Sequence, residues 1–267
     1  MPSTRTWPAA IAALSFLAAA TATTAATAAP TAQVFDRVAK PEAVDAQWRP
    51  TLCALLSKSC SAEELGLYRP RGSAEGEYVV LSVKPLAMAR VQRTADGSWR
   101  LQRLHDFSAY QGTSSKLGGG REPQRSLAPA LYPLADGRWA VAVQSAFSDM
   151  YSGGGASFVV ADFVPLEGDP ATAKPAYEDI PFWCSQMIRA CFSEKEYKTS
   201  PHCHDETAGS LRIAYADAAR PGAAHGWSFS WTESEWPAHK PRSARRSGTT
   251  RFTATDTSAV PFCGGPQ

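Results

Sequence analysis

Short apolar runs separated by glycine, proline and polar residues recur along the chain and predict β-strands rather than helices. At 227–231, Trp227, Phe229 and Trp231 alternate with polar residues, so a strand there places all three aromatic rings on one face. We interpret this face as core, with an exposed platform for a sugar ring or a partner protein as the alternative. Four further strand-like runs are 77–83, 139–143, 157–164 and 210–215.

Two Asp-Gly pairs, Asp96-Gly97 and Asp136-Gly137, lie between apolar runs and mark tight turns. A two-residue hairpin turn needs the positive φ that Gly and Asp tolerate. Many short strands with such punctuation predict a mainly β fold with a few short helices. The arrangements that fit are an antiparallel sandwich, a barrel or a small propeller-like assembly, stapled by disulfides.

The first residues have the pattern of a secretory signal peptide. A single charged side chain, Arg5, precedes an apolar run at 9–20, which is shorter than the roughly 20 residues needed to span a bilayer. Ala26-Thr27-Ala28 then fits the small-residue cleavage rule. The predicted segments are a signal peptide at 1–28, a flexible N-terminal segment at 29–44 and a single mature β domain at 45–267. We therefore expect the protein in the periplasm or outside the cell, and the Ala- and Arg-rich composition is typical of a bacterium.

The chain has six cysteines, and an even number in an exported protein favours disulfides. Spacing favours pairing within the two short cysteine segments and between the two cysteines that remain. Residues seven apart on a straight helix lie about 10 Å apart by helical rise, whereas a disulfide needs Cα atoms within about 7 Å, so these segments must bend. Other pairings stay open. The predicted bonds are Cys53–Cys60, Cys184–Cys191 and Cys203–Cys263.

The two short cysteine segments resemble each other. Six residues separate the cysteines in both, and a serine–glutamate pair with capping-box spacing follows each, Ser61 with Glu64 and Ser193 with Glu196. This similarity predicts two pseudo-repeated halves. The alternative is that the cysteine spacing is similar by chance. The halves would span 45–165 and 178–267.

Charge and hydropathy exclude several kinds of partner. The net charge of +2 gives no reason to expect nucleic acid or an anionic membrane surface. No cysteine precedes Cys53, so we expect no lipid anchor, and no later segment is apolar enough to form a transmembrane segment. The expected partner is a protein or an envelope ligand.

Two groups of residues are candidates for binding. In the predicted loop 148–156, Tyr151, Gly153, Gly154 and Gly155 form a glycine-rich run that lacks the Gly-Lys-Ser/Thr of a phosphate loop. We interpret it as a flexible turn, or as a loop whose bare amides approach a ligand. We expect no cofactor.

His202 and His204 flank Cys203 and share a face if the segment is extended. Two imidazoles and a thiolate could hold zinc or copper, but only if Cys203 is free. Because the even cysteine count favours an oxidised Cys203, we assign the two histidines to a binding turn and predict no metal.

Catalytic motifs are absent from the sequence: it contains no Gly-x-Ser-x-Gly, Ser-x-x-Lys or His-Glu-x-x-His. His105 beside Asp106 is typical of a polar pair at a strand end, and Glu233 with Glu235 would suit glycoside chemistry only at the right separation in space. We therefore expect a non-enzymatic binding protein, such as an inhibitor, an immunity factor or a ligand-binding module. The alternative is a hydrolase of envelope polymer.

Overall fold

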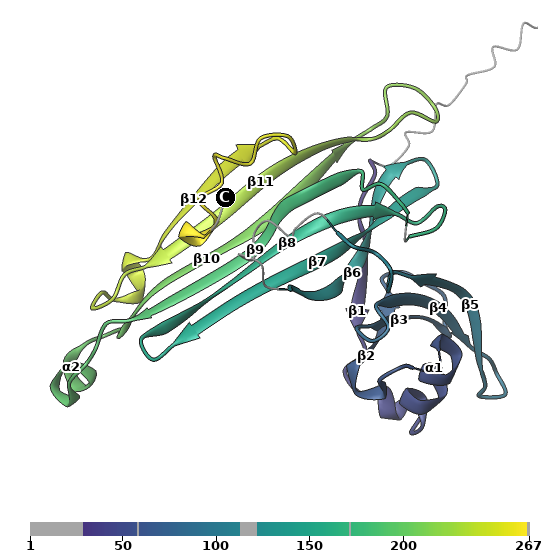
Figure 1. Ribbon diagram of the computed structural model, residues 1–267, viewed down its shortest axis with the longest axis horizontal. Helices are drawn as coiled ribbons and strands as arrows, with labels where there is room; N and C mark the ends of the chain where they lie inside the picture. Colours follow the sequence, from purple (N-terminus) through teal and green to yellow (C-terminus); the bar gives the residue numbers. More distant parts are fainter. Residues whose placement is uncertain (1–28, 58, 113–121, 171, 266–267) are drawn as a thin grey trace, which may run out of the picture.

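The computed structural model describes residues 29–57, 59–112, 122–170 and 172–265, so the predicted signal peptide lies outside the described residues. The described chain forms one antiparallel sheet of twelve strands with a few short helices, which confirms the mainly β prediction (Figure 1). The strands are β1 (Gln33–Arg37), β2 (Leu65–Pro70), β3 (Glu77–Ser82), β4 (Ala87–Arg93), β5 (Trp99–Asp106), β6 (Gln124–Ala135), β7 (Arg138–Tyr151), β8 (Gly154–Pro165), β9 (Tyr177–Arg189), β10 (His204–Ala216), β11 (Gly226–Trp236) and β12 (Arg246–Phe252). The α-helices are α1 (Trp48–Leu56) and α2 (Glu194–Thr199).

Strand β1 joins two parts of the sheet. It pairs with β2 on one side and with β6 on the other, so β2–β5 continue the sheet in one direction and β6–β12 in the other. The segment 29–44, expected to be flexible, therefore contains a strand with neighbours on both sides. Phe35 anchors it and is only 2 % exposed.

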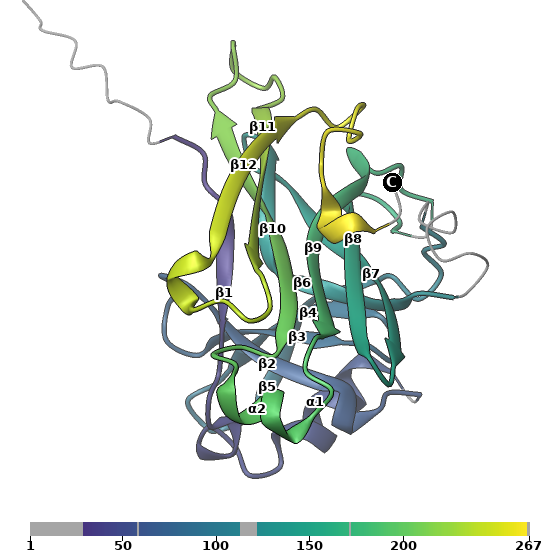
Figure 2. The same ribbon diagram turned by 90° about the vertical axis from the view of Figure 1, so that its left-hand side faces the viewer.

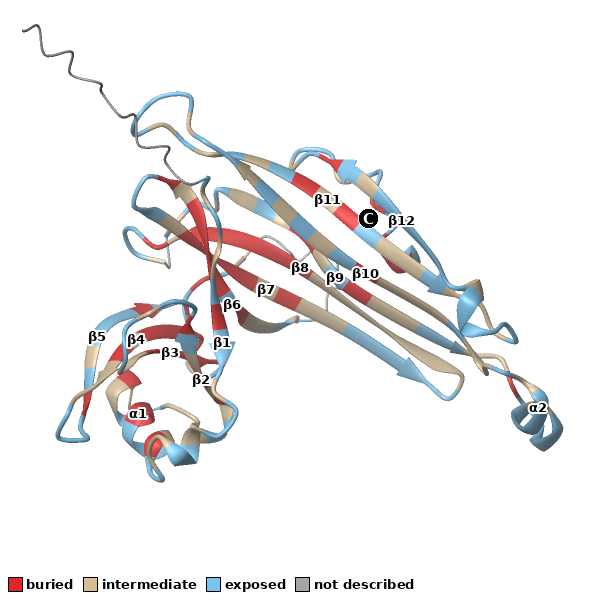
Figure 3. Cartoon of the chain, turned by 180° about the vertical axis from the view of Figure 1, so that it is seen from behind, coloured by how far each residue is buried: buried red, intermediate tan, exposed pale blue. Residues whose placement is uncertain are grey.

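Successive residues in the central parts of β6, β7 and β8 are buried, so these strands are covered on both faces, and Figure 3 shows the buried stretches in red. Val141 and Val143 of β7 pack in one cluster with β3 and β4, including Val79. The alternating residues Ala140 and Ala142 point to the opposite face and belong to a second cluster. This places β7 between two apolar layers, as expected for a strand whose neighbours are buried on both sides.

The predicted aromatic face of β11 lies in the second cluster. Trp231 is fully buried and Phe229 is 4 % exposed, while Trp227 is partly buried against the same cluster. The interpretation of this face as core is confirmed, because alternation directs all three rings toward the second cluster.

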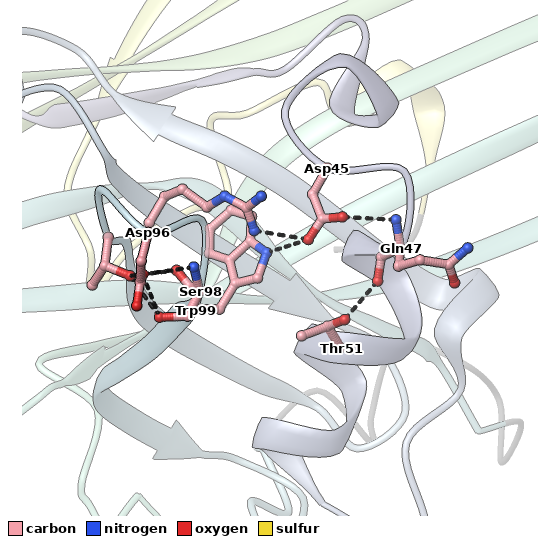
Figure 4. Close-up of polar contacts among 8 residues, drawn as sticks. Asp45, Gln47, Thr51, Asp96, Ser98 and Trp99 are labelled. Carbon is pink, nitrogen blue, oxygen red and sulfur yellow. Dashed lines mark hydrogen bonds and ion pairs between the residues drawn. The ribbon is translucent and has the colours of Figure 1, made fainter.

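Helix α1 covers the free face of the small sheet β2–β5 through Trp48 and Leu52. The loop before the helix is fixed by Asp45, whose carboxylate accepts hydrogen bonds from Arg93 Nη1, Trp99 Nε1 and the Gln47 amide, each at 2.8 Å (Figure 4). One carboxylate therefore ties the start of α1 to β4 and β5.

One predicted disulfide is present and two are wrong. Cys53 and Cys60 are bonded because α1 ends at Leu56 and the chain turns back. The observed partners of the other cysteines are Cys184–Cys263 and Cys191–Cys203, in place of Cys184–Cys191 and Cys203–Cys263. Cys184 lies within β9 and Cys191 just beyond its end, and seven residues of extended chain span about 23 Å, which no disulfide can bridge.

The two similar cysteine segments adopt different structures. Cys53 lies on a helix and Cys184 on a strand. The second capping box forms at α2, where the Ser193 hydroxyl accepts from the Glu196 amide, but Ser61 makes no side-chain cap hydrogen bond. The first cysteine of each segment therefore lies on a different kind of secondary structure, a helix in one half and a strand in the other.

Both Asp-Gly pairs lie in turns, with both glycines at positive φ. Asp136-Gly137 is the two-residue connection from β6 to β7 that the sequence predicts, whereas Asp96-Gly97 is part of a longer connection, 94–98, between β4 and β5. No helix in the described part of the chain is long and apolar enough to cross a membrane.

Candidate functional site

The two groups of candidate binding residues lie at the same end of the molecule. The long strands carry them away from α1 and the small sheet, to an end formed by the β7–β8 hairpin, the end of β9, α2 and the start of β10 (Figure 1). We call this the distal end. Figure 2 looks onto it, with α2 in front of the sheet.

The glycine-rich run is part of a hairpin rather than a flexible loop. Tyr151 pairs with Gly154, and Gly154 also pairs with Ile188 of β9, so the glycine backbone is used on both sides by the sheet. A Cβ on Gly154 would overlap the carbonyl oxygen of Met187, and one on Gly153 would lie 2.9 Å from the Tyr151 ring. The glycines thus allow close strand packing, and their neighbours' side chains form the surface.

Large apolar side chains are exposed at this end. Met150 is 83 % exposed, Phe192 70 % and Tyr151 60 %. Folded domains rarely expose several such side chains close together unless that surface binds a partner. We name as the distal apolar patch the exposed apolar side chains around this end, which are Met150, Tyr151, Met187, Ile188, Phe192 and Tyr197. Strand pairing places Met150 with Met187 on one face of the sheet and Tyr151 with Ile188 on the other.

Arg189 organises the α2 side of this patch. Its guanidinium lies 5.3 Å from the Phe192 ring and 5.6 Å from the Tyr197 ring, and its Nε donates to the Cys191 carbonyl at 2.8 Å. Cation–π contacts of this kind hold exposed rings in place. The Phe192 amide also donates to Glu196, and this hydrogen bond is the largest of those that lower the pKa of the Glu196 carboxyl.

The second group of candidate residues forms a compact cluster. His204 and Glu206 are alternate residues of β10, so their side chains share one face, and His202 lies two residues before the strand. One nitrogen or oxygen from each lies within 4.8 Å of the others, and His202 Nε2 is 3.5 Å from Glu206 Oε1. The His202 ring stacks on Trp236 of β11 with centroids 3.5 Å apart and planes 2° apart.

The backbone of this cluster is held on two sides. Cys203 is bonded to Cys191, and its carbonyl accepts from the Ala190 amide at 2.9 Å. The His202 carbonyl accepts from the His239 amide at 2.8 Å. Cys203 is therefore no thiolate ligand, as the even cysteine count predicted, and the third polar group near the imidazoles is the Glu206 carboxylate.

The patch and the cluster are adjacent. Gly155 of β8 pairs with Met187 of β9, which pairs with Glu206 of β10, which pairs with Trp236. Neighbouring strands lie about 4.8 Å apart, so the Met187 side chain stands between the hairpin and the histidine cluster. Tyr151, His202 and His204 could be predicted from the sequence. The other residues of the patch could not, because their closeness depends on strand register.

The other residues considered for catalysis include Glu233, which is hydrogen-bonded within the fold, and His105, which is buried. Glu233 Oε2 accepts from Trp231 Nε1 at 2.8 Å and from the Cys263 amide at 2.9 Å, so its carboxylate fixes the C-terminal segment to the core. His105 is buried at 5 % exposure in β5, whereas the adjacent Asp106 is exposed.

We expect stability to fall in mild acid because of His105. Burial, with Arg103 and Arg90 nearby, lowers the pKa of His105 from 6.5 to about 4. Between these pH values the unfolded chain binds a proton that the folded chain does not, so the free energy of unfolding decreases as pH falls through this window. Urea unfolding at several pH values should show a flatter profile for His105→Asn. The same slope in both proteins would contradict the role of His105.

Comparisons of the chain with protein-family models, curated proteins and solved structures found no match. The geometry of the distal end is therefore the basis for a proposed function.

Proposed function

We propose that this chain is an exported, disulfide-bonded binding protein without enzymatic activity, and that it engages a partner protein through the distal apolar patch. The observation that carries the proposal is the exposure of Met150, Phe192 and Tyr151 around one end of the sheet. Methionine and aromatic side chains are enriched at the centres of protein interfaces.

Rigidity supports recognition of a protein. β7 and β8 pair along their whole length up to the hairpin, and the Cys191–Cys203 bond closes the α2 segment beside them. A preformed surface loses little conformational entropy on binding, which raises affinity. An inhibitor or an immunity factor would use such a projecting end to enter a groove of its target.

Export is supported by the cysteines. All six are bonded in three disulfides, which persist in oxidising compartments. The signal-like pattern of residues 1–28 points to the same compartment, the periplasm or the exterior. An envelope-polymer hydrolase has less support, because the Glu233 carboxylate is engaged by the core.

Affinity capture with the oxidised chain tests this function. We expect one stoichiometric partner from envelope or secreted fractions, retained at high salt because the contact is apolar. The double variant Met150→Asp/Phe192→Ser should bind that partner at least about 30-fold more weakly, since an interface hot spot contributes about 2 kcal/mol or more.

The control is Leu104→Asp, which changes an apolar side chain of β5 that is 38 % exposed and far from the distal end. It should leave affinity unchanged. Capture that persists undiminished in Met150→Asp/Phe192→Ser, or the absence of any partner in these fractions, would contradict the proposed function.

A further inference from the structure

We propose that His202, His204 and Glu206 form a binding site for a divalent transition-metal ion such as Zn²⁺. The proposal concerns the isolated chain and does not depend on the partner protein. Three observations support it. They are the spacing of the three groups, the unsatisfied Nε2 of His202, and the contacts that hold the His202–Glu206 segment in place.

The spacing is close to that of a metal site. Two ligands of tetrahedral zinc, each about 2.0–2.1 Å from the ion, lie roughly 3.4 Å apart. His202 Nε2 and Glu206 Oε1 are already 3.5 Å apart, and the three candidate ligand atoms lie within 4.8 Å of one another. The Glu206 side chain is 43 % exposed, so it is free to rotate toward an ion.

His202 has an unsatisfied nitrogen directed into the cluster. Its side chain is only 10 % exposed, and its Nε2 is buried without a hydrogen-bond partner among the described residues. Buried polar atoms of native proteins nearly always have a partner. A metal ion bound between His202 and Glu206 would supply one.

The fold holds the first ligand in place before any ion arrives. The stack on Trp236 fixes the plane of the His202 ring, and the Cys191–Cys203 bond fixes the backbone between the two histidines. The His239 amide adds a hydrogen bond to the His202 carbonyl. A site whose supporting residues are locked in this way binds without a large ordering cost.

The donor set selects the class of ion. Imidazole nitrogens suit Zn²⁺, Cu²⁺ and Ni²⁺, whereas Mg²⁺ and Ca²⁺ prefer oxygen ligands alone. Two histidines and one carboxylate leave a fourth position of tetrahedral zinc for a water molecule or a group from a partner. The Arg189 guanidinium, on the strand next to His204, is engaged with Phe192, Tyr197 and the Cys191 carbonyl.

The test is calorimetric titration of the chelator-treated, oxidised chain, prepared without a histidine tag, with ZnCl₂ and separately with MgCl₂. We expect one zinc site and no magnesium binding. His204→Gln and Glu206→Gln should each weaken zinc binding at least tenfold. At zinc concentrations about 100-fold above the dissociation constant, the melting temperature should rise by about 5–10 °C.

The matched control is His225→Gln. His225 also has a buried ring facing a carboxylate, Asp136, at 3.8 Å, but it lies at the opposite end of β11 and no second histidine joins it among the described residues. This variant should bind zinc as the unmodified chain does. A Cu²⁺ complex should show coupling to two nitrogens in its electron paramagnetic resonance spectrum, and only one in His204→Gln.

Absence of stoichiometric zinc binding would overturn the proposal, and so would zinc binding that is unchanged in both His204→Gln and Glu206→Gln. In those cases the contact between His202 and Glu206 serves the fold alone. The patch variant Met150→Asp/Phe192→Ser should keep its zinc affinity, so failure of this site and failure of the proposed partner binding can be distinguished.

Discussion

Removing the Cys184–Cys263 bond with the double variant Cys184→Ala/Cys263→Ala should lower the free energy of unfolding by about 4.5 kcal/mol. The bond closes a segment of 79 residues, so its loss frees a large part of the unfolded chain. It also ties the end of the chain to β9 in the core, where both cysteines are buried. Urea or guanidinium unfolding under non-reducing conditions measures the difference.

The matched control is Cys53→Ala/Cys60→Ala, which opens a loop closed over only seven residues. Its expected cost is about 2.4 kcal/mol by the same dependence on loop length. The order of the two losses is the decisive result. If the short loop costs as much as the long one, the C-terminal segment does not depend on its disulfide in the way the structure indicates.

The second large effect is expected at Trp48, which α1 packs against the small sheet. Trp48 is 2 % exposed and contacts the cluster that includes Leu52, Leu67 and Val91. Trp48→Ala removes most of the contact between helix and sheet and leaves a cavity, so the free energy of unfolding should fall by about 3–5 kcal/mol. Denaturant unfolding followed by circular dichroism checks this.

Trp183→Ala serves as the comparison, because it makes the same chemical change on a strand at a side chain that is 41 % exposed. Its expected cost is smaller, about 2 kcal/mol, since about two fifths of the residue is already in solvent and less surface is uncovered than at Trp48. Equal losses for Trp48→Ala and Trp183→Ala would mean that α1 does not close the core of the small sheet.

The alternation of Trp227, Phe229 and Trp231 was enough to predict a strand with a buried face, and the Asp-Gly pairs were enough to place two turns. These signals are local, since each depends on neighbours in sequence. Strand β1 has no comparable signal because Phe35 is its single buried residue. Its place in the sheet is decided by pairing with β2 and β6, which no local pattern reports.

The wrong cysteine pairs have the same origin. Cys184 and Cys191 are close in sequence, but a strand separates them, and the cysteine nearest to Cys184 in space comes from the end of the chain. The distal apolar patch was missed for a related reason. Met150 and Met187 are brought near each other by Gly155, which lies between them in register. Glu206 could be identified as a candidate ligand only from the structure, which places its carboxylate beside His202 Nε2.

The position of β1 has a consequence for the order in which the protein folds. The chain is synthesised from its N-terminus, so β1 can pair with β2 as soon as β2 emerges, while its other partner, β6, begins only at Gln124. Until then β1 has an open edge of unpaired amides and carbonyls, the kind of edge that recruits strands from other chains. A half-made chain is therefore vulnerable to association at β1, an edge that becomes an interior strand once β6 has paired with it.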